Sequence, residues 1–93
     1  MGWQHEARQR FIHAWAAEAP GWTQRDGWMG AVCFDAPHPP GRQAGLLIVT
    51  AGQVEEPFFG HRWHITKDTA ALVAKVRAAM EREGQTGWRE GSA

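Results

Sequence analysis

The histidines are the side chains in this sequence best suited to binding a metal, but their spacing argues against it. His61 and His64 stand three residues apart, on either side of Arg62-Trp63. In a strand, that spacing sends the two imidazoles to opposite faces of the sheet, so they cannot bind the same ion. The sequence therefore predicts no metal ligands and no cofactor at this pair.

Cys33, Asp35 and His38 form a second group of candidate ligands. They offer mixed ligand types, but their spacing matches no standard zinc motif. Cys33 lies in an apolar run, where a cysteine usually acts as a small buried hydrophobe, and Asp35 suits a turn. We expect no metal here either. A small metal-dependent enzyme remains as a third function.

Groups that could act as catalytic nucleophiles or acids lack the partners they need. Ser92, the single serine, lies next to the C-terminal residue. Cys33 has no adjacent base to form the reactive thiolate. Glu55 and Glu56 are neighbours in a predicted turn and point apart, whereas glycosidase carboxylates face each other. The sequence therefore predicts no catalytic residues, and a protein that is not an enzyme.

Basic and aromatic residues of the predicted sheet suggest a second class of function, nucleic-acid binding. A modest basic patch could contact phosphates while Trp63 stacks on bases; its members are Arg25, Arg42, Arg62, His61 and His64. The element order is similar to that of double-stranded-RNA-binding domains, whose last helix begins with a basic phosphate clamp. Here residues 66–69 read Thr-Lys-Asp-Thr, and ten basic residues balance ten acidic ones. Nucleic acid is therefore an alternative partner that the sequence does not favour.

Two segments have the apolar period of amphipathic helices. Residues 3–18 place apolar side chains at steps of three and four, and Pro20-Gly21 ends the pattern. Residues 67–83 do the same, with Thr66 as the predicted N-cap and Gly84 just past the end. The buried stripe of this second helix is predicted to comprise Leu72, Val73, Val76, Ala79 and Met80.

Between the helices, the sequence predicts three or four strands. Asp26-Gly27 is a strong hairpin signal before a strand at 28–34, and residues 44–50 form an apolar, β-branched run. Residues 51–57 are expected to turn back into a strand at 58–65. Residues 35–43 are rich in proline and are expected to form a loop, although Pro37 to Arg42 also matches the pattern that SH3 domains bind.

These elements predict an α+β fold, a two-layer sandwich in the order α-β-β-β(-β)-α. Short connections favour an antiparallel meander sheet with both helices on one face. Residues 1–84 form the single predicted domain, and residues 85–93 a flexible C-terminal tail. No segment is long and apolar enough to span a membrane, and the lone Cys33 excludes an internal disulfide. We therefore expect a cytoplasmic protein.

Strand alternation divides the apolar residues of the sheet between two faces, and only one face can be covered by the helices. We assign Trp28, Val32, Phe59, Trp63 and Ile65 to the covered core. The candidate interaction surface on the open face then comprises Met29, Ala31, Phe58, Arg62 and His64. A bulge in one strand would reverse its assignment.

Surplus aromatic residues without catalytic groups are typical of an interaction protein, since exposed apolar patches mark interfaces. The sequence has six Trp and four Phe among its 93 residues. We expect a non-enzymatic binding protein, an inhibitor or adaptor that docks on another protein or on a second copy as a homodimer. One setting for such a chain is a phage- or plasmid-encoded inhibitor of bacterial defence.

Overall fold

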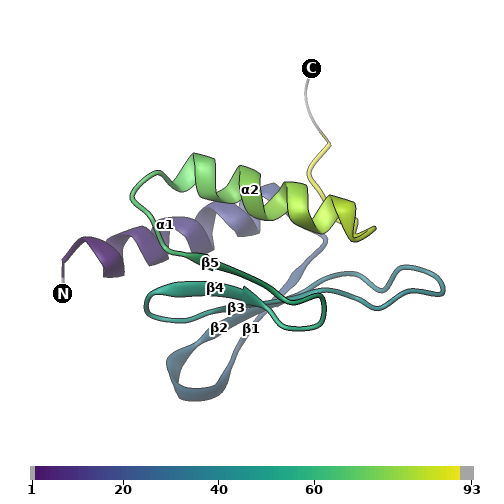
Figure 1. The fold of residues 1–93 in the computed structure, drawn as a ribbon, viewed down its shortest axis with the longest axis horizontal. Coiled ribbons are helices and arrows are strands. Elements are labelled where there is room, and N and C mark those ends of the chain that lie inside the picture. The colour runs from purple at the N-terminus through teal and green to yellow at the C-terminus, as the bar shows by residue number, and fades with distance from the viewer. Residues whose placement is uncertain (1, 91–93) are drawn as a thin grey trace.

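The computed structural model describes residues 2–90. Helix α1 (Trp3–Glu18) comes first, followed by strands β1 (Thr23–Asp26), β2 (Val32–Asp35), β3 (Leu46–Val49), β4 (Gln53–Glu56) and β5 (His61–His64), and then helix α2 (Thr69–Arg82). The strands form one antiparallel meander in sequence order, β1-β2-β3-β4-β5. Figure 1 shows both helices on the same side of this sheet. The predicted two-layer α+β sandwich is confirmed.

Both helices form where the apolar period predicts them. Helix α1 has the predicted bounds and buries Ala7, Phe11, Ile12 and Trp15. Helix α2 starts two residues later than predicted because Asp68, not Thr66, is the N-cap and accepts a hydrogen bond from the Ala71 N–H at 3.0 Å. Its buried residues are those of the predicted stripe.

A fifth strand, β4, occupies a segment that the sequence analysis assigned to a turn. Residues 53–56 pair with β3 through Val49↔Val54 and with β5 through Val54↔Trp63. Glu56 is fully buried there, not exposed at a loop tip as its charge suggests. Its carboxylate accepts hydrogen bonds from the backbone N–H groups of Leu46 (2.9 Å) and Phe59 (2.6 Å), which satisfies the buried oxygens.

One core joins the helices to a single face of the sheet. Leu47, Val49 and Val54 are fully buried in one cluster with residues of both helices, so their face of the sheet is the covered one. Cross-strand partners share a face, and Phe34↔Leu47 and Val54↔Trp63 extend the covered face to β2 and β5. Val32, Trp63 and Ile65 contact or join this core, as predicted.

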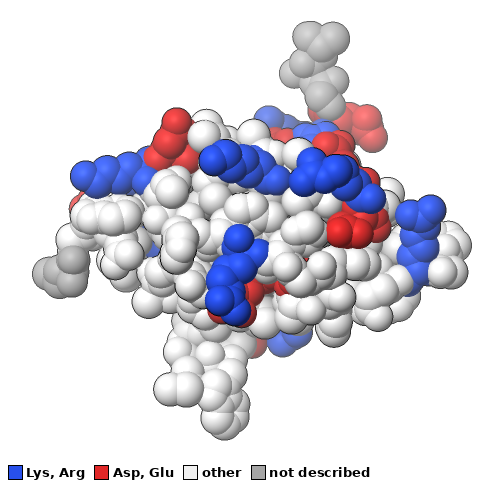
Figure 2. All heavy atoms as spheres, in the orientation of Figure 1, with Lys and Arg blue, Asp and Glu red and all other residues white. Residues whose placement is uncertain are grey.

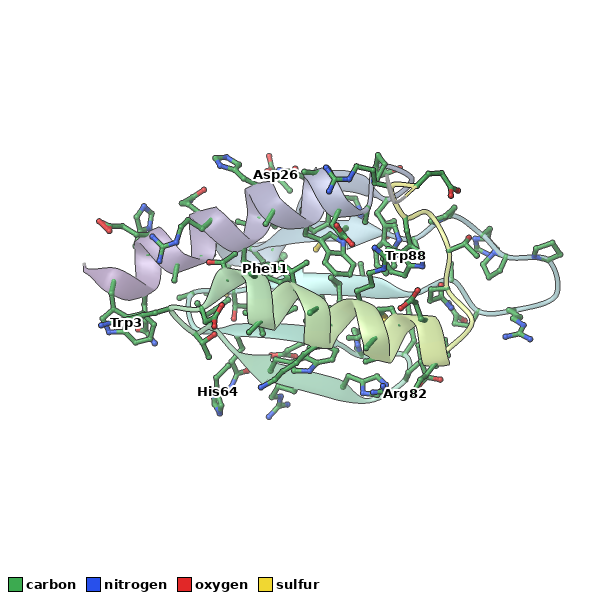
Figure 3. All side chains as sticks on the ribbon, turned by 90° about the horizontal axis from the view of Figure 1, so that it is seen from above. Trp3, Phe11, Asp26, His64, Arg82 and Trp88 are labelled. Atoms are coloured by element: carbon green, nitrogen blue, oxygen red, sulfur yellow. The ribbon has the colours of Figure 1, made fainter. Side chains whose placement is uncertain are left out.

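Trp15 is the aromatic centre of the core. Its ring lies 6.0 Å from that of Phe11, 5.2 Å from that of Trp22 and 5.6 Å from that of Trp88. Figure 3 shows Trp88 farther toward the C-terminal end of α1 than Phe11, where the C-terminal segment of the chain passes over the end of the sandwich. Trp15 is the only side chain among residues 2–90 with a buried polar atom, Nε1, that has no hydrogen-bond partner.

The predicted tail at 85–93 is packed on the domain over its described part, residues 85–90. Gln85 is buried, and its side chain accepts from the Gly45 N–H at 2.7 Å and donates to the Gln43 carbonyl at 3.0 Å. The indole of Trp22 donates to the Thr86 carbonyl at 2.8 Å. These contacts tie the segment to the loop before β3 and to the start of β1. Residues 91–93 lie outside the described residues.

The proline-rich loop reverses direction in its middle. The Arg42 N–H bonds to the Pro39 carbonyl at 3.3 Å, and Gly41 has a φ of 68°, as the third position of a type II turn requires. Pro39 is buried. An SH3 ligand is one continuous polyproline helix, so this turn separates Pro37 from Arg42 and does not present the motif.

Candidate functional site

The five residues of the predicted interaction surface do not gather in one place. Arg62 and His64 are exposed on the face of the sheet that the helices leave uncovered, since their partners Glu55 and Gln53 alternate with the buried Val54. They lie on β5, at one edge of the sheet. Figure 3 shows His64 and Asp26, the last residue of β1, at opposite sides of the molecule.

Phe58 lies outside the strand that was predicted to hold it. It is 55% exposed in the turn between β4 and β5, and Phe59 is half-buried in the same turn. The strand begins only at His61, after Gly60 with a φ of 79°. Phe58 is therefore an exposed side chain, but it is not part of the open sheet face.

The β1–β2 hairpin departs most from the sequence analysis. Residues 28–30 form a short 3-10 turn, not the first half of a strand. Met29 is exposed as predicted, but Ala31 is buried. Trp28, assigned to the covered core, is 85% exposed, and Met29 is 89% exposed. We call the side chains of Trp28 and Met29 the apolar tip.

A shift in the turn explains this error. The tight turn has Met29 and Gly30 at its centre, with φ of 56° and 81°, and is closed by the Ala31 N–H on the Trp28 carbonyl at 3.2 Å. Those angles are the positive values of a type I′ turn, predicted instead at Asp26-Gly27. The strand register pairs Asp26 with Val32, so Gly27 and Trp28 together oppose Ala31. That extra residue takes Trp28 off the covered face.

Arg8 of α1 holds the tip in place. Its guanidinium donates to the Gly30 carbonyl at 2.9 Å, to the Thr50 carbonyl at 3.0 Å and to the Val49 carbonyl at 3.3 Å. One side chain therefore links the first helix, the end of β3 and the hairpin turn. The sequence gives no sign of this role, because the partners of Arg8 are backbone carbonyls at least 22 residues away that leave no local pattern.

A hollow of about 890 Å³ lies beside the apolar tip. It runs from the first turns of α1 past the hairpin to the open face of the sheet, and we call it the hollow. Its lining includes the tip itself, Ala31, Cys33, Leu46, Ile48, Thr50 and Arg8. Leu46 and Ile48 are half-buried on the open face. A hollow of this volume with a largely apolar lining is typical of sites that bind a ligand or the side chains of a partner.

Charges at the rim of the hollow and along the open face are balanced. Two guanidinium nitrogens of Arg25 donate hydrogen bonds to the two carboxylate oxygens of Asp35, Nε to Oδ2 at 2.5 Å and Nη2 to Oδ1 at 3.2 Å. Donating this hydrogen bond to the Asp35 carboxylate raises the pKa of Arg25, so the arginine stays protonated. Further along the open face, Glu55 sits opposite Arg62. The described part of this face therefore carries charges of both signs side by side.

Within residues 2–90, no three His, Cys, Asp or Glu side chains come together to hold a metal ion. His61 lies on the covered side and bonds to Glu83 at 2.8 Å, while His64 lies on the open face. The opposite-face prediction for this pair is confirmed. Cys33 is buried at the floor of the hollow, where Ile48 is its cross-strand partner.

The distribution of charged residues also distinguishes the tip from the rest of the molecule. Figure 2 shows Lys and Arg mixed with Asp and Glu over α2, and a lobe projecting from the far side of the sheet whose end carries no charged residue. That lobe is the β1–β2 hairpin of Figure 1. No helix among the described residues has the length and apolar content to cross a bilayer.

Comparison of the chain with protein-family models, with curated proteins and with solved structures found no match. The apolar tip and the hollow are the features of the described residues best suited to binding another molecule.

Proposed function

We propose that the protein is a non-enzymatic binding protein, an inhibitor or adaptor that docks on protein surfaces through the apolar tip and the hollow. The observation that supports this most strongly is the exposure of two adjacent large apolar side chains, Trp28 and Met29. Trp is the residue most enriched at interface hot spots, and Met adapts to irregular apolar surfaces.

Two features of the tip reduce the stability of the isolated chain. Both side chains leave apolar surface in water, and Met29 adopts a left-handed backbone conformation that costs roughly 1–2 kcal/mol for a residue with a Cβ. Local strain of this kind concentrates at functional sites. Both costs are offset when a partner covers the tip.

The Arg8 bonds make the tip suited to binding. They hold the Gly30 carbonyl and so fix the turn before a partner arrives. A loop that is already ordered loses less conformational entropy on binding than a mobile one. Arg8 is therefore a positioning residue for this surface. The proposal also places the protein in a reducing compartment, in keeping with the free thiol of Cys33.

The test is affinity capture with matched variants. Tagged wild type, Trp28→Ala and Phe58→Ala are each incubated with lysate of the source organism, and captured proteins are quantified by mass spectrometry. Phe58 is the control because it is also an exposed large side chain, but lies in the β4–β5 turn. We expect a partner or the untagged chain itself to be retained by wild type and Phe58→Ala and lost with Trp28→Ala. Equal retention by all three would contradict the proposal.

A further inference from the structure

We propose that the hollow binds the apolar tip of a second copy of this chain, in a two-fold symmetric dimer with two equivalent tip-in-hollow contacts. This inference rests on the proposed function, because it requires the tip and the hollow to be a protein-binding surface. It adds the identity of the occupant.

The first argument is self-complementarity. A two-fold interface uses the same patch on both chains, so that patch must contain both a projection and a matching recess. The tip is a convex apolar projection, and the hollow is an apolar recess directly beside it, with Trp28 and Met29 forming part of its wall. In such a dimer the β1–β2 hairpins of the two chains lie side by side, and the tip of each chain packs against Leu46 and Ile48 of the other.

The second argument is area. Trp28 and Met29 are 85% and 89% exposed, so the tip offers roughly 350–400 Å² to a partner. Two tips, together with the exposed lining of two hollows, bury at most about 1,200 Å² in total, the lower limit for a specific interface. The central part of that area is apolar, as the core of a stable homodimer interface requires.

The third argument is charge. The chain has a formal net charge of zero, so two copies approach without net repulsion. Arg25, which lines the hollow, is paired with Asp35 beside it, so this edge carries one charge of each sign. Under a two-fold axis, such a rim can place opposite charges against each other. A partner of strong single-sign charge would find no matching field here.

The oligomeric state is the first test. Analytical ultracentrifugation of the wild type should give a species of twice the 10.4 kDa chain mass that dissociates on dilution. Trp28→Ala should raise the dimer dissociation constant at least about tenfold, the effect of losing a hot-spot side chain. Phe58→Ala should leave it unchanged. Circular dichroism of each variant shows that the fold is retained, since both side chains are exposed.

Complementation between variants is the second and sharper test. Ile48→Lys blocks the hollow and leaves the tip intact, whereas Trp28→Ala removes the larger side chain of the tip and keeps Leu46 and Ile48, the residues against which a partner's tip is seated. Each variant alone should be monomeric. Mixed together, they should form a heterodimer, because the tip of the first chain can still enter the hollow of the second. Leu46→Lys serves in place of Ile48→Lys if that variant does not fold.

The outcomes separate this inference from the proposed function. A wild type that stays monomeric up to about 0.5 mM, well above micromolar dimer affinities, overturns the dimer. A dimer that Trp28→Ala leaves unchanged, or that shows no complementation, also overturns the tip-in-hollow contact. If dimerisation fails while a foreign partner is captured in a Trp28-dependent way, only the inference falls. If Trp28-dependent capture also fails, the proposed function falls with it.

Discussion

At the scale of single residues, Met29 is the position where the sequence and the backbone disagree most. Its φ of 56° belongs to a region that favours Gly and Asn, and it is the only residue with a side chain at positive φ among those described. Its side chain is exposed, so no core packing offsets the strain. The hydrogen bonds of the turn, from Arg8 to the Gly30 carbonyl and from the Ala31 N–H to the Trp28 carbonyl, hold this conformation in the isolated chain.

Replacing Met29 with glycine should therefore stabilise the isolated chain. Relief of the left-handed strain exceeds the added entropy of the unfolded chain, so we expect the free energy of unfolding to rise by about 0.5–1 kcal/mol. Urea denaturation at about 1 μM protein measures it, a concentration chosen to limit stabilisation by self-association. A loss of stability would show that the Met29 side chain supports the fold. In the ultracentrifuge, the same variant should dimerise more weakly than wild type.

Glu56 presents the opposite case, a charged residue that the fold buries. Both carboxylate oxygens accept backbone N–H groups, one from Leu46 at the start of β3 and one from Phe59 in the β4–β5 turn. Glu56→Gln leaves one of those N–H groups facing an amide NH₂. We expect a loss of about 1–3 kcal/mol, the cost of one unsatisfied buried group.

Glu55→Gln is the matched control for that measurement. Glu55 is the preceding residue and is half-buried on the open face. It should change the free energy of unfolding by less than about 0.5 kcal/mol, as is usual for a surface substitution. Equal effects of the two variants in urea denaturation would contradict the role assigned to the Glu56 carboxylate.

At the scale of elements, the C-terminal segment acts as part of the domain. Trp88 packs against Trp15 and Trp22, and the Arg77 guanidinium lies 5.1 Å from the Trp88 ring. The side-chain amide of Gln85 is hydrogen-bonded to the backbone of the loop before β3, at the Gly45 N–H and the Gln43 carbonyl. Residues 85–90 therefore close one end of the sandwich.

Gln85→Ala should destabilise the fold, because it leaves the Gly45 N–H and the Gln43 carbonyl without their side-chain partner. We expect a loss of about 1–3 kcal/mol in thermal or urea unfolding. Thr86→Ala is the control, since the Thr86 side chain is exposed and only its backbone carbonyl is used, by Trp22. An unchanged melting temperature in Gln85→Ala would contradict the role assigned to the Gln85 side chain.

The β1–β2 hairpin shows how one residue decides which side chains an element exposes. Strand alternation from Asp26 would place Trp28 on the covered face, alongside Val32. The extra residue between Asp26 and the turn breaks that alternation, and the helices do not cover the hairpin end. Trp28, which strand alternation assigns to the core, is thus one of the two large apolar side chains exposed at the end of the hairpin.

At the scale of the whole molecule, charge is distributed without a dominant sign. Figure 2 shows both signs over α2, and on the open face Asp35 neutralises Arg25 while Glu55 faces Arg62. Nucleic-acid affinity depends on several cations that each release counterions from phosphates. The structure offers no such set on the sheet face that was considered for it.

We therefore expect no binding of single- or double-stranded oligonucleotides tighter than about 10 μM at physiological salt, a non-specific level. Fluorescence anisotropy over a series of salt concentrations measures this. Submicromolar binding that weakens steeply with salt and is lost in Arg62→Ala would instead establish the nucleic-acid alternative. Arg89→Ala, which changes an exposed arginine of the C-terminal segment, controls for a general loss of positive charge.

Sequence alone determined the helices, the order of elements and most of the core. The apolar period of a helix is local, so residues 3–18 and the stripe from Leu72 to Met80 carry their own assignment. Strand β4 could not be predicted from the sequence because Val54 is the only apolar residue among its four. An alternating apolar pattern needs at least two apolar residues to be recognised.

Tertiary structure decided the surface. Of the five residues predicted to form it, only Arg62 and His64 share the open sheet face, since strand faces depend on register and a shift of one residue exchanges them. The Arg8 bonds join segments at least 22 residues apart, and the hollow is lined by residues of α1, the β1–β2 hairpin and β3. Such contacts are fixed by packing of the whole chain, and no local pattern of residues encodes them.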